Sequence, residues 1–97
     1  MELNEAIQQI LKEIRKDEYF DSHAIIKELM INKEYHQIYL EEYSKGLTVA
    51  QYHGKIAQMI GKTGVVKKIQ DDTKDILIKT HTIYGDLSEN HLWKKIK

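Results

Sequence analysis

The chain contains neither cysteine nor proline. Without cysteine it can form no disulfide framework and no reactive thiolate, which is consistent with a cytosolic protein. It also has no linker, low-complexity segment or internal repeat. No apolar run approaches the roughly 18 residues of a transmembrane helix. Glu2 and Glu5 also interrupt the segment in which a signal peptide would be apolar. These absences predict a cytoplasmic protein without a membrane partner.

The residues that are present are typical of a globular domain. Of the 97 residues, 41% are hydrophobic and 31% are charged, so we expect a single folded domain over residues 1–97. The net charge is zero, but residues 1–46 hold six cations and ten anions (−4), and residues 47–97 hold nine cations and five anions (+4). A dipolar chain could turn its basic end toward nucleic acid. Imbalances of this size also arise by chance in small domains.

Apolar residues at helical spacing predict three helices in the first half of the chain. The first has apolar residues from Leu3 to Ile14, and its pattern stops around Lys16 and Asp17. The second begins after Asp21 or Ser22, either of which can cap a helix, and ends near Asn32. The third is expected over residues 33–44. One face of each helix is predicted to enter a common core.

A fourth helix, over residues 48–62, has the clearest start signal. Thr48 and Gln51 have the spacing of a capping box, and two local apolar residues are placed as a hydrophobic staple. Gly54 lies inside this helix, where glycine costs about 1 kcal/mol relative to alanine. Its presence indicates a close approach by another backbone or by a ligand. We favour a tight helix crossing in the core.

The solvent face of this helix carries long amides and amines. Its residues step by four, three and four positions, which places them on one side of the helix. They are Gln51, Lys55, Gln58 and Lys62. Glutamine can pair bidentately with adenine, and lysine can reach guanine or a phosphate. The same residue types are common on any solvated helix, so both interpretations stay open.

The periodicity changes after Gly64. β-Branched residues over 65–69 and 76–84 flank the polar segment 70–75, which predicts a β-hairpin. Asp86 or Ser88 can then cap a short helix that carries Leu92, Trp93 and Ile96.

The chain thus has a helix, a short extended segment, further helices and then a basic hairpin. This order of elements resembles the winged-helix class of helix-turn-helix DNA-binding domains. The resemblance implies an α+β fold with four helices, a β-hairpin wing and a short C-terminal helix. Residues 48–62 would be the recognition helix and residues 65–84 the basic wing. The residues implied in nucleic-acid binding are Gln51, Lys55, Gln58, Lys62, Lys67, Lys68, Lys74 and Lys79. Residues 33–47 add a helix that the winged-helix pattern usually lacks, and such folds also serve as protein-interaction modules.

The sequence does not support a catalytic or cofactor site. Residues 60–63 match the end of a phosphate-binding P-loop, but Ile56 stands where that motif needs glycine. Residues 21–23 include the residue types of a hydrolase triad, yet neighbours in sequence point in different directions. The five histidines lack metal-ligand spacing. We therefore expect no enzyme, no metal and no cofactor.

Tyr35, Tyr39 and Tyr43 form a stripe along the third predicted helix. Tyrosine is favoured at interfaces, so this stripe could bind a protein partner or a second copy of the chain. We favour a stripe that covers the core with its hydroxyls at the rim. The predicted function is a small, non-enzymatic domain that binds double-stranded DNA or regulates transcription. The alternative is a protein-interaction or inhibitory accessory domain that uses the tyrosine face.

Overall fold

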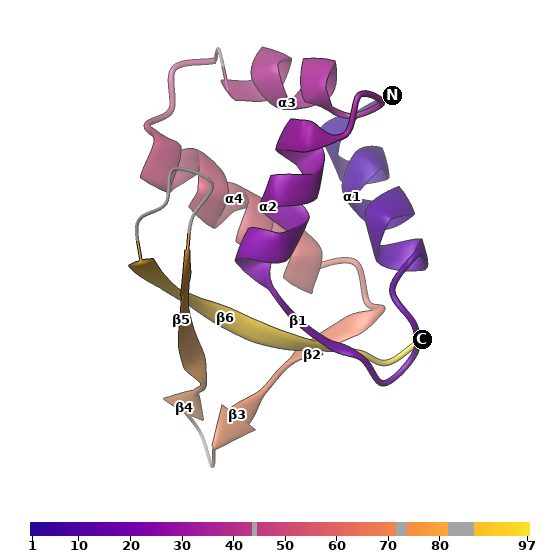
Figure 1. Ribbon diagram of the computed structural model, residues 1–97, viewed down its shortest axis with the longest axis vertical. Helices are drawn as coiled ribbons and strands as arrows, with labels where there is room; N and C mark the ends of the chain where they lie inside the picture. The colour runs from indigo at the N-terminus through magenta and orange to yellow at the C-terminus, as the bar shows by residue number, and fades with distance from the viewer. Residues whose placement is uncertain (44, 72–73, 82–86) are drawn as a thin grey trace.

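The computed structural model describes residues 1–43, 45–71, 74–81 and 87–97. In this part of the chain the fold is α+β, with four helices and a small antiparallel sheet (Figure 1). The helices are α1 (Leu3–Lys12), α2 (Ser22–Ile31), α3 (His36–Tyr43) and α4 (Val49–Gly61). The strands are β1 (Tyr19–Asp21), β2 (Val66–Lys68), β3 (Gln70–Asp71), β4 (Lys74–Asp75), β5 (Leu77–His81) and β6 (Leu87–Lys95).

Local side chains determine where α2 and α4 begin. The Asp21 carboxylate accepts a hydrogen bond from the backbone N–H of Ala24 at 2.8 Å and so caps α2. The predicted capping box of α4 is confirmed. The Gln51 N–H donates to the Thr48 hydroxyl at 3.2 Å, and the Thr48 N–H donates to the Gln51 side-chain oxygen at 3.0 Å.

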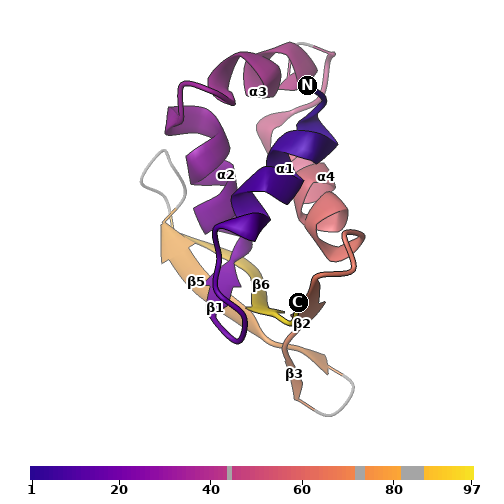
Figure 2. The same cartoon turned by 90° about the vertical axis from the view of Figure 1, so that its right-hand side faces the viewer.

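Strand β6 organises the sheet. Its second half lies between β1 and β2, and both pairings are antiparallel, so Trp93 is opposite Phe20 on one side and Lys68 on the other. Its first half pairs only with β5. Strands β3 and β4 form a separate two-stranded hairpin. The helices gather at one end of the molecule and the strands at the other, as the rotated view also shows (Figure 2).

The short extended segment expected between the first two helices is the strand β1. The order of elements differs from the predicted one in two other places. The predicted C-terminal helix over residues 88–96 is wrong, because this segment is the central strand β6. The predicted hairpin of 65–69 with 76–84 is also different, since β2 and β5 both pair with β6. Residues 82–86, which include the predicted strand end at Tyr84 and the possible cap Asp86, lie outside the described residues.

The hydrophobic core lies between the helices and the sheet. Helix α4 contributes Tyr52, Ile56 and Ile60, which are fully buried, as the predicted face of this helix requires. Trp93 of β6 closes the core from the sheet side. Within the described residues, no helix is long and apolar enough to cross a membrane.

The tyrosine stripe of α3 belongs to this core. Tyr35 and Tyr39 are only 7% and 2% exposed, and Tyr43 packs against the same cluster. The Tyr35 hydroxyl donates to the side chain of Gln9 at 3.3 Å. Tyr35 and Tyr39 therefore cover the core, as the favoured interpretation of the stripe requires, and Tyr43 is only partly buried.

Candidate nucleic-acid interface

A groove of about 1080 Å³ lies between α4, the start of α2 and strand β6. The wall that α4 provides is made of small residues spaced by four, three and four positions, on one side of the helix. They are Ala50, Gly54, Ala57 and Gly61. Residues 88–91 and Trp93 of β6 form much of the opposite wall. Because the small side chains take up little space, the backbone of α4 is accessible from this side.

The predicted solvent face of α4 is exposed along its whole length. Gln51, Lys55, Gln58 and Lys62 are all exposed, and Gln58 and Lys62 also line the groove. Gln51 has a second role that the sequence indicated separately, since its side-chain oxygen is engaged in the capping box. A glutamine needs both its oxygen and its nitrogen to pair with adenine. Gln58 is therefore the better placed of the two to read a base.

The two adjacent lysines of β2 point to opposite faces of the sheet, because successive strand side chains alternate. Lys68 is opposite Trp93 in the sheet, its amine lies 5.9 Å from the Trp93 ring centroid, and it lines the groove. Lys67 is opposite Lys94, whose amine lies 5.6 Å from the Tyr19 ring centroid. The sequence grouped Lys67 with Lys68 on one binding surface, and the alternation separates them.

The other two predicted wing lysines are exposed on different strands. Lys74 of β4 is paired across the hairpin with Asp71. Lys79 of β5 is paired with Glu89 of β6. Directly opposite strand residues lie close together, so a carboxylate accompanies each of these cations. Eight residues are predicted to bind nucleic acid. Among the described residues, three of these eight line the groove, namely Gln58, Lys62 and Lys68.

A polar cluster ties the arm formed by β5 and β6 to the start of α2. The His23 ring nitrogen Nδ1 lies 2.7 Å from the Thr80 hydroxyl. The Asn90 amide donates to the same hydroxyl at 3.1 Å and accepts from the His23 N–H at 3.3 Å. Sequence reasoning missed Thr80 and Asn90, because their role depends on the pairing of β5 with β6.

The three adjacent residues with the side-chain types of a hydrolase triad have separate structural roles. Asp21 caps α2, and His23 contacts Thr80. Ser22 is buried, and its hydroxyl accepts a hydrogen bond from the Trp93 indole N–H at 2.9 Å. The three side chains therefore do not converge on one reaction centre.

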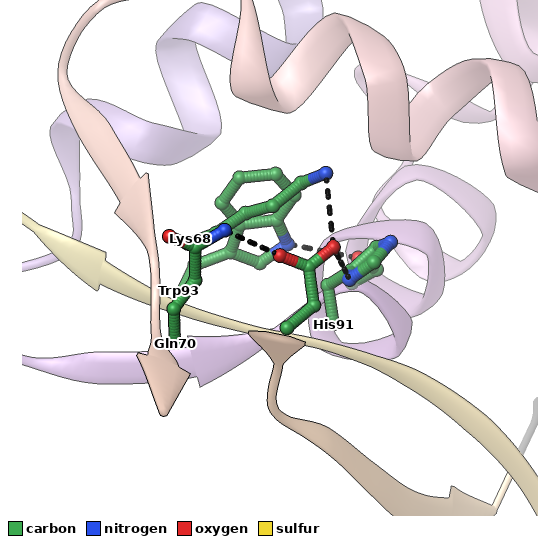
Figure 3. Close-up of polar contacts among 6 residues, drawn as sticks. Lys68, Gln70, His91 and Trp93 are labelled. Atoms are coloured by element: carbon green, nitrogen blue, oxygen red, sulfur yellow. Dashed lines mark hydrogen bonds and ion pairs between the residues drawn. The ribbon is translucent and has the colours of Figure 1, made fainter. Parts of the chain in front are cut away.

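Asp75 of β4 is the centre of a second polar cluster (Figure 3). The Gln70 amide donates to one Asp75 carboxylate oxygen at 2.7 Å. The Lys68 amine lies 3.5 Å and the His91 Nδ1 3.7 Å from the other oxygen. The hydrogen bond from Gln70 is the main cause that lowers the pKa of Asp75, and the charge of Lys68 adds to it. The sequence predicted only a solvated turn here.

His53 lies on the groove wall and links α4 to α3. Its Nε2 is 2.8 Å from the Tyr39 hydroxyl. Burial lowers the pKa of His53 from its usual value of 6.5, with a smaller contribution from the nearby His23. The neutral imidazole is therefore the form that this position favours.

Gly54 does not mark the tight helix crossing that we favoured from the sequence. It is exposed, and a Cβ atom added there would meet none of the described atoms within 4 Å. At Gly61, in contrast, a Cβ would come 3.1 Å from the Trp93 ring. Packing inside the protein therefore explains the glycine at position 61 but not the one at position 54.

In comparisons with known proteins, the chain matches no protein-family model, no curated protein and no solved structure.

Proposed function

We propose that this chain is a non-enzymatic winged-helix-like domain that binds double-stranded DNA and regulates transcription in the cytoplasm. The observation that carries the proposal is the exposed amide and amine face of α4, which continues through Gln58 and Lys62 into a groove also lined by Lys68. The α+β composition, with four helices and a small antiparallel sheet among the described residues, supports the same proposal. So does the position of β6 between β1 and β2.

Each of these side chains has a distinct chemical role in the proposal. Gln58 reads an adenine edge, because its amide offers a donor and an acceptor together. Lys55 and Lys62 reach guanine or a phosphate from the same helix face. Lys68 contacts a phosphate from the sheet side of the groove. For the protein-interaction alternative, which uses the tyrosine face or the acidic half of the chain, the burial of Tyr35 and Tyr39 leaves the acidic half as the more accessible surface.

The salt dependence of duplex binding tests this proposal. Phosphate contacts by Lys55, Lys62 and Lys68 would give a plot of log affinity against log salt with a slope of about −3. The measurement is fluorescence anisotropy with a labelled duplex between about 50 and 200 mM salt. No binding at about 50 mM salt would overturn the proposal, because phosphate contacts are strongest there.

Neighbouring lysines supply a matched control for the interface. Lys68→Gln should reduce the magnitude of the salt slope by about 1, because one phosphate contact is lost. Lys67→Gln removes the same charge from the opposite face of the same strand, so it should leave the slope nearly unchanged. Equal effects of the two variants would show that the groove is not the contact surface.

A separate variant tests base recognition. Gln58→Ala should weaken the preference for the best duplex by about 1–3 kcal/mol and leave the salt slope unchanged. A competition assay between duplexes of different sequence measures this preference. If Gln58→Ala weakens all duplexes alike, then Gln58 does not read a base.

A further inference from the structure

The surroundings of the Asp75 carboxylate resemble those of a bound anion. Three groups from three strands converge on it, namely the Gln70 amide of β3, the Lys68 amine of β2 and the His91 imidazole of β6. Figure 3 shows the labelled Lys68, Gln70 and His91 side chains turned toward a common point above the sheet. An ammonium, an amide N–H and an imidazole N–H are also groups that bind phosphate oxygens.

The carboxylate satisfies only part of this site. Its second oxygen lies 3.7 Å from His91 Nδ1, which is too long for a hydrogen bond. The Nδ1 atom is buried and has no hydrogen-bond partner among the described residues. Leaving a buried polar atom unpaired is unfavourable. A phosphate group, which is larger and has more acceptor oxygens than a carboxylate, can bridge the lysine and the histidine.

The ion pair between Lys68 and Asp75 is weak enough to be exchanged. The Lys68 and Asp75 side chains are 41% and 31% exposed, and an ion pair with this exposure contributes little because solvent screens it. Asp75 lies on the short hairpin of β3 and β4, in which only two residue pairs are matched. Lys68, in contrast, belongs to the main sheet and lies over the Trp93 ring.

We propose that Lys68, Gln70 and His91 form a phosphate-binding site beside the groove, and that Asp75 occupies this site in the free protein as an internal competitor. The native ligand would be a backbone phosphate of the bound duplex, and in this respect the inference rests on the proposed function. The site itself accepts any accessible phosphate, so it can be examined without DNA. When a phosphate occupies the site, the Asp75 carboxylate moves into solvent and His91 Nδ1 gains a hydrogen-bond partner.

Asp75→Asn is the first test with duplex DNA. This variant removes the competing charge but keeps an acceptor for Gln70, so duplex affinity should rise about fivefold, the scale of one exposed ion pair. This gain in affinity should be absent when Lys68→Gln is also present, because the phosphate then has no ammonium group to bind. Asp71→Asn is the matched control, since it removes the same charge from the same hairpin. Asp75→Ala, which no longer offers Gln70 an acceptor, should raise the affinity in the same direction.

Inorganic phosphate is the probe for the second test. NMR spectra of the Asp75→Asn protein should show saturable shifts of the Lys68 and His91 side-chain signals as phosphate is added. The double variant with Lys68→Gln should not show them, and neither should chloride at the same ionic strength.

The two tests distinguish the inference from the proposed function. If Asp75→Asn and Asp71→Asn raise duplex affinity equally, and phosphate leaves Lys68 and His91 unchanged, the inference is overturned and the proposed function stands. If no variant binds duplex but phosphate shifts these signals, the proposed function is overturned and the phosphate site stands. If both responses are absent, both proposals are wrong.

Discussion

Among single residues, Lys95 has the least expected environment. It is only 5% exposed, and its amine donates hydrogen bonds to the backbone carbonyls of Leu11 and Ile14, at the end of α1. The last carbonyls of a helix lack partners within the helix, and the helix dipole favours a positive charge there. Lys95 of the last strand, β6, thus supplies hydrogen-bond donors to carbonyls at the end of the first helix, α1.

Lys95→Met should lower the free energy of unfolding by about 1–3 kcal/mol, because it removes the two hydrogen bonds that the amine donates to the Leu11 and Ile14 carbonyls, while the apolar part of the side chain is kept. Lys97→Met is the control. It changes an exposed lysine two positions away and should stay within about 0.5 kcal/mol of the original protein. Denaturant titration measures both values. Equal stabilities of the two variants would show that the Lys95 contacts contribute nothing.

Gly54→Ala should raise the free energy of unfolding by up to about 1 kcal/mol, because alanine is the better helix former and the added Cβ meets no described atom. The same variant should weaken duplex binding if a ligand approaches α4 closely from the groove. Gly61→Ala is the comparison, since contact of its Cβ with Trp93 should cancel the gain in stability. If Gly54→Ala is more stable and binds duplex unchanged, no ligand approaches this part of α4.

At the scale of elements, α4 could be predicted from the sequence and β6 could not. The beginning and the faces of α4 depend on residues within one helical length, namely the Thr48 capping box and the apolar positions of the helix itself. Residues 77–81 are near β6 in sequence, but its partners in the central part of the sheet are residues 19–21 and 66–68, which are distant. A local pattern cannot report these pairings.

The composition of β6 also lacks the clear alternation of apolar and polar residues that identifies a strand. Alternate positions of a strand point to the same face, and here that face carries His91, Trp93 and Lys95. Only one of these residues is apolar, although Lys95 is buried as deeply as a core residue. Leu92, Trp93 and Ile96 happen to have helical spacing instead. The separation of Lys67 from Lys68 and the cluster around Asp75 follow from this register, so they could not be predicted either.

The contact between α3 and α4 should make stability depend on pH. Burial holds the pKa of His53 below 6.5 in the folded protein, so the unfolded chain binds a proton more readily. The stabilising contribution is complete above about pH 6.5 and is lost as the pH falls from there through the folded pKa. His53→Gln, which keeps a polar partner for Tyr39 but does not titrate, should lose less stability on acidification.

Denaturant titrations at about pH 7.5 and pH 5 measure this difference. His81→Gln is the control, because it makes the same substitution at an exposed residue of β5. If His53→Gln and the original protein lose equal stability between the two pH values, His53 does not titrate in the predicted direction.

At the scale of the whole molecule, the acidic and basic parts of the sequence correspond to different parts of the fold. Residues 1–46, with a net charge of −4, form α1, β1, α2 and α3, and residues 47–97, with +4, form α4 and the other strands. The groove lies where these parts meet, and the lysines that line it come from the second part. This division would let the molecule turn its basic part toward a duplex and keep its acidic helices away.

The same architecture makes the second half of β6 the last part of the sheet to open. Residues 92–94 are matched to β1 and residues 93–95 to β2, and Trp93 also fills the core, so the amides of residues 92–95 should exchange with solvent only on global unfolding. Residues 87–91 have one neighbouring strand and should exchange faster. The amides of the short β3–β4 hairpin should exchange fastest. Hydrogen exchange followed by NMR measures this order, and exchange of residues 92–95 as fast as that of Lys74 and Asp75 would contradict a central β6.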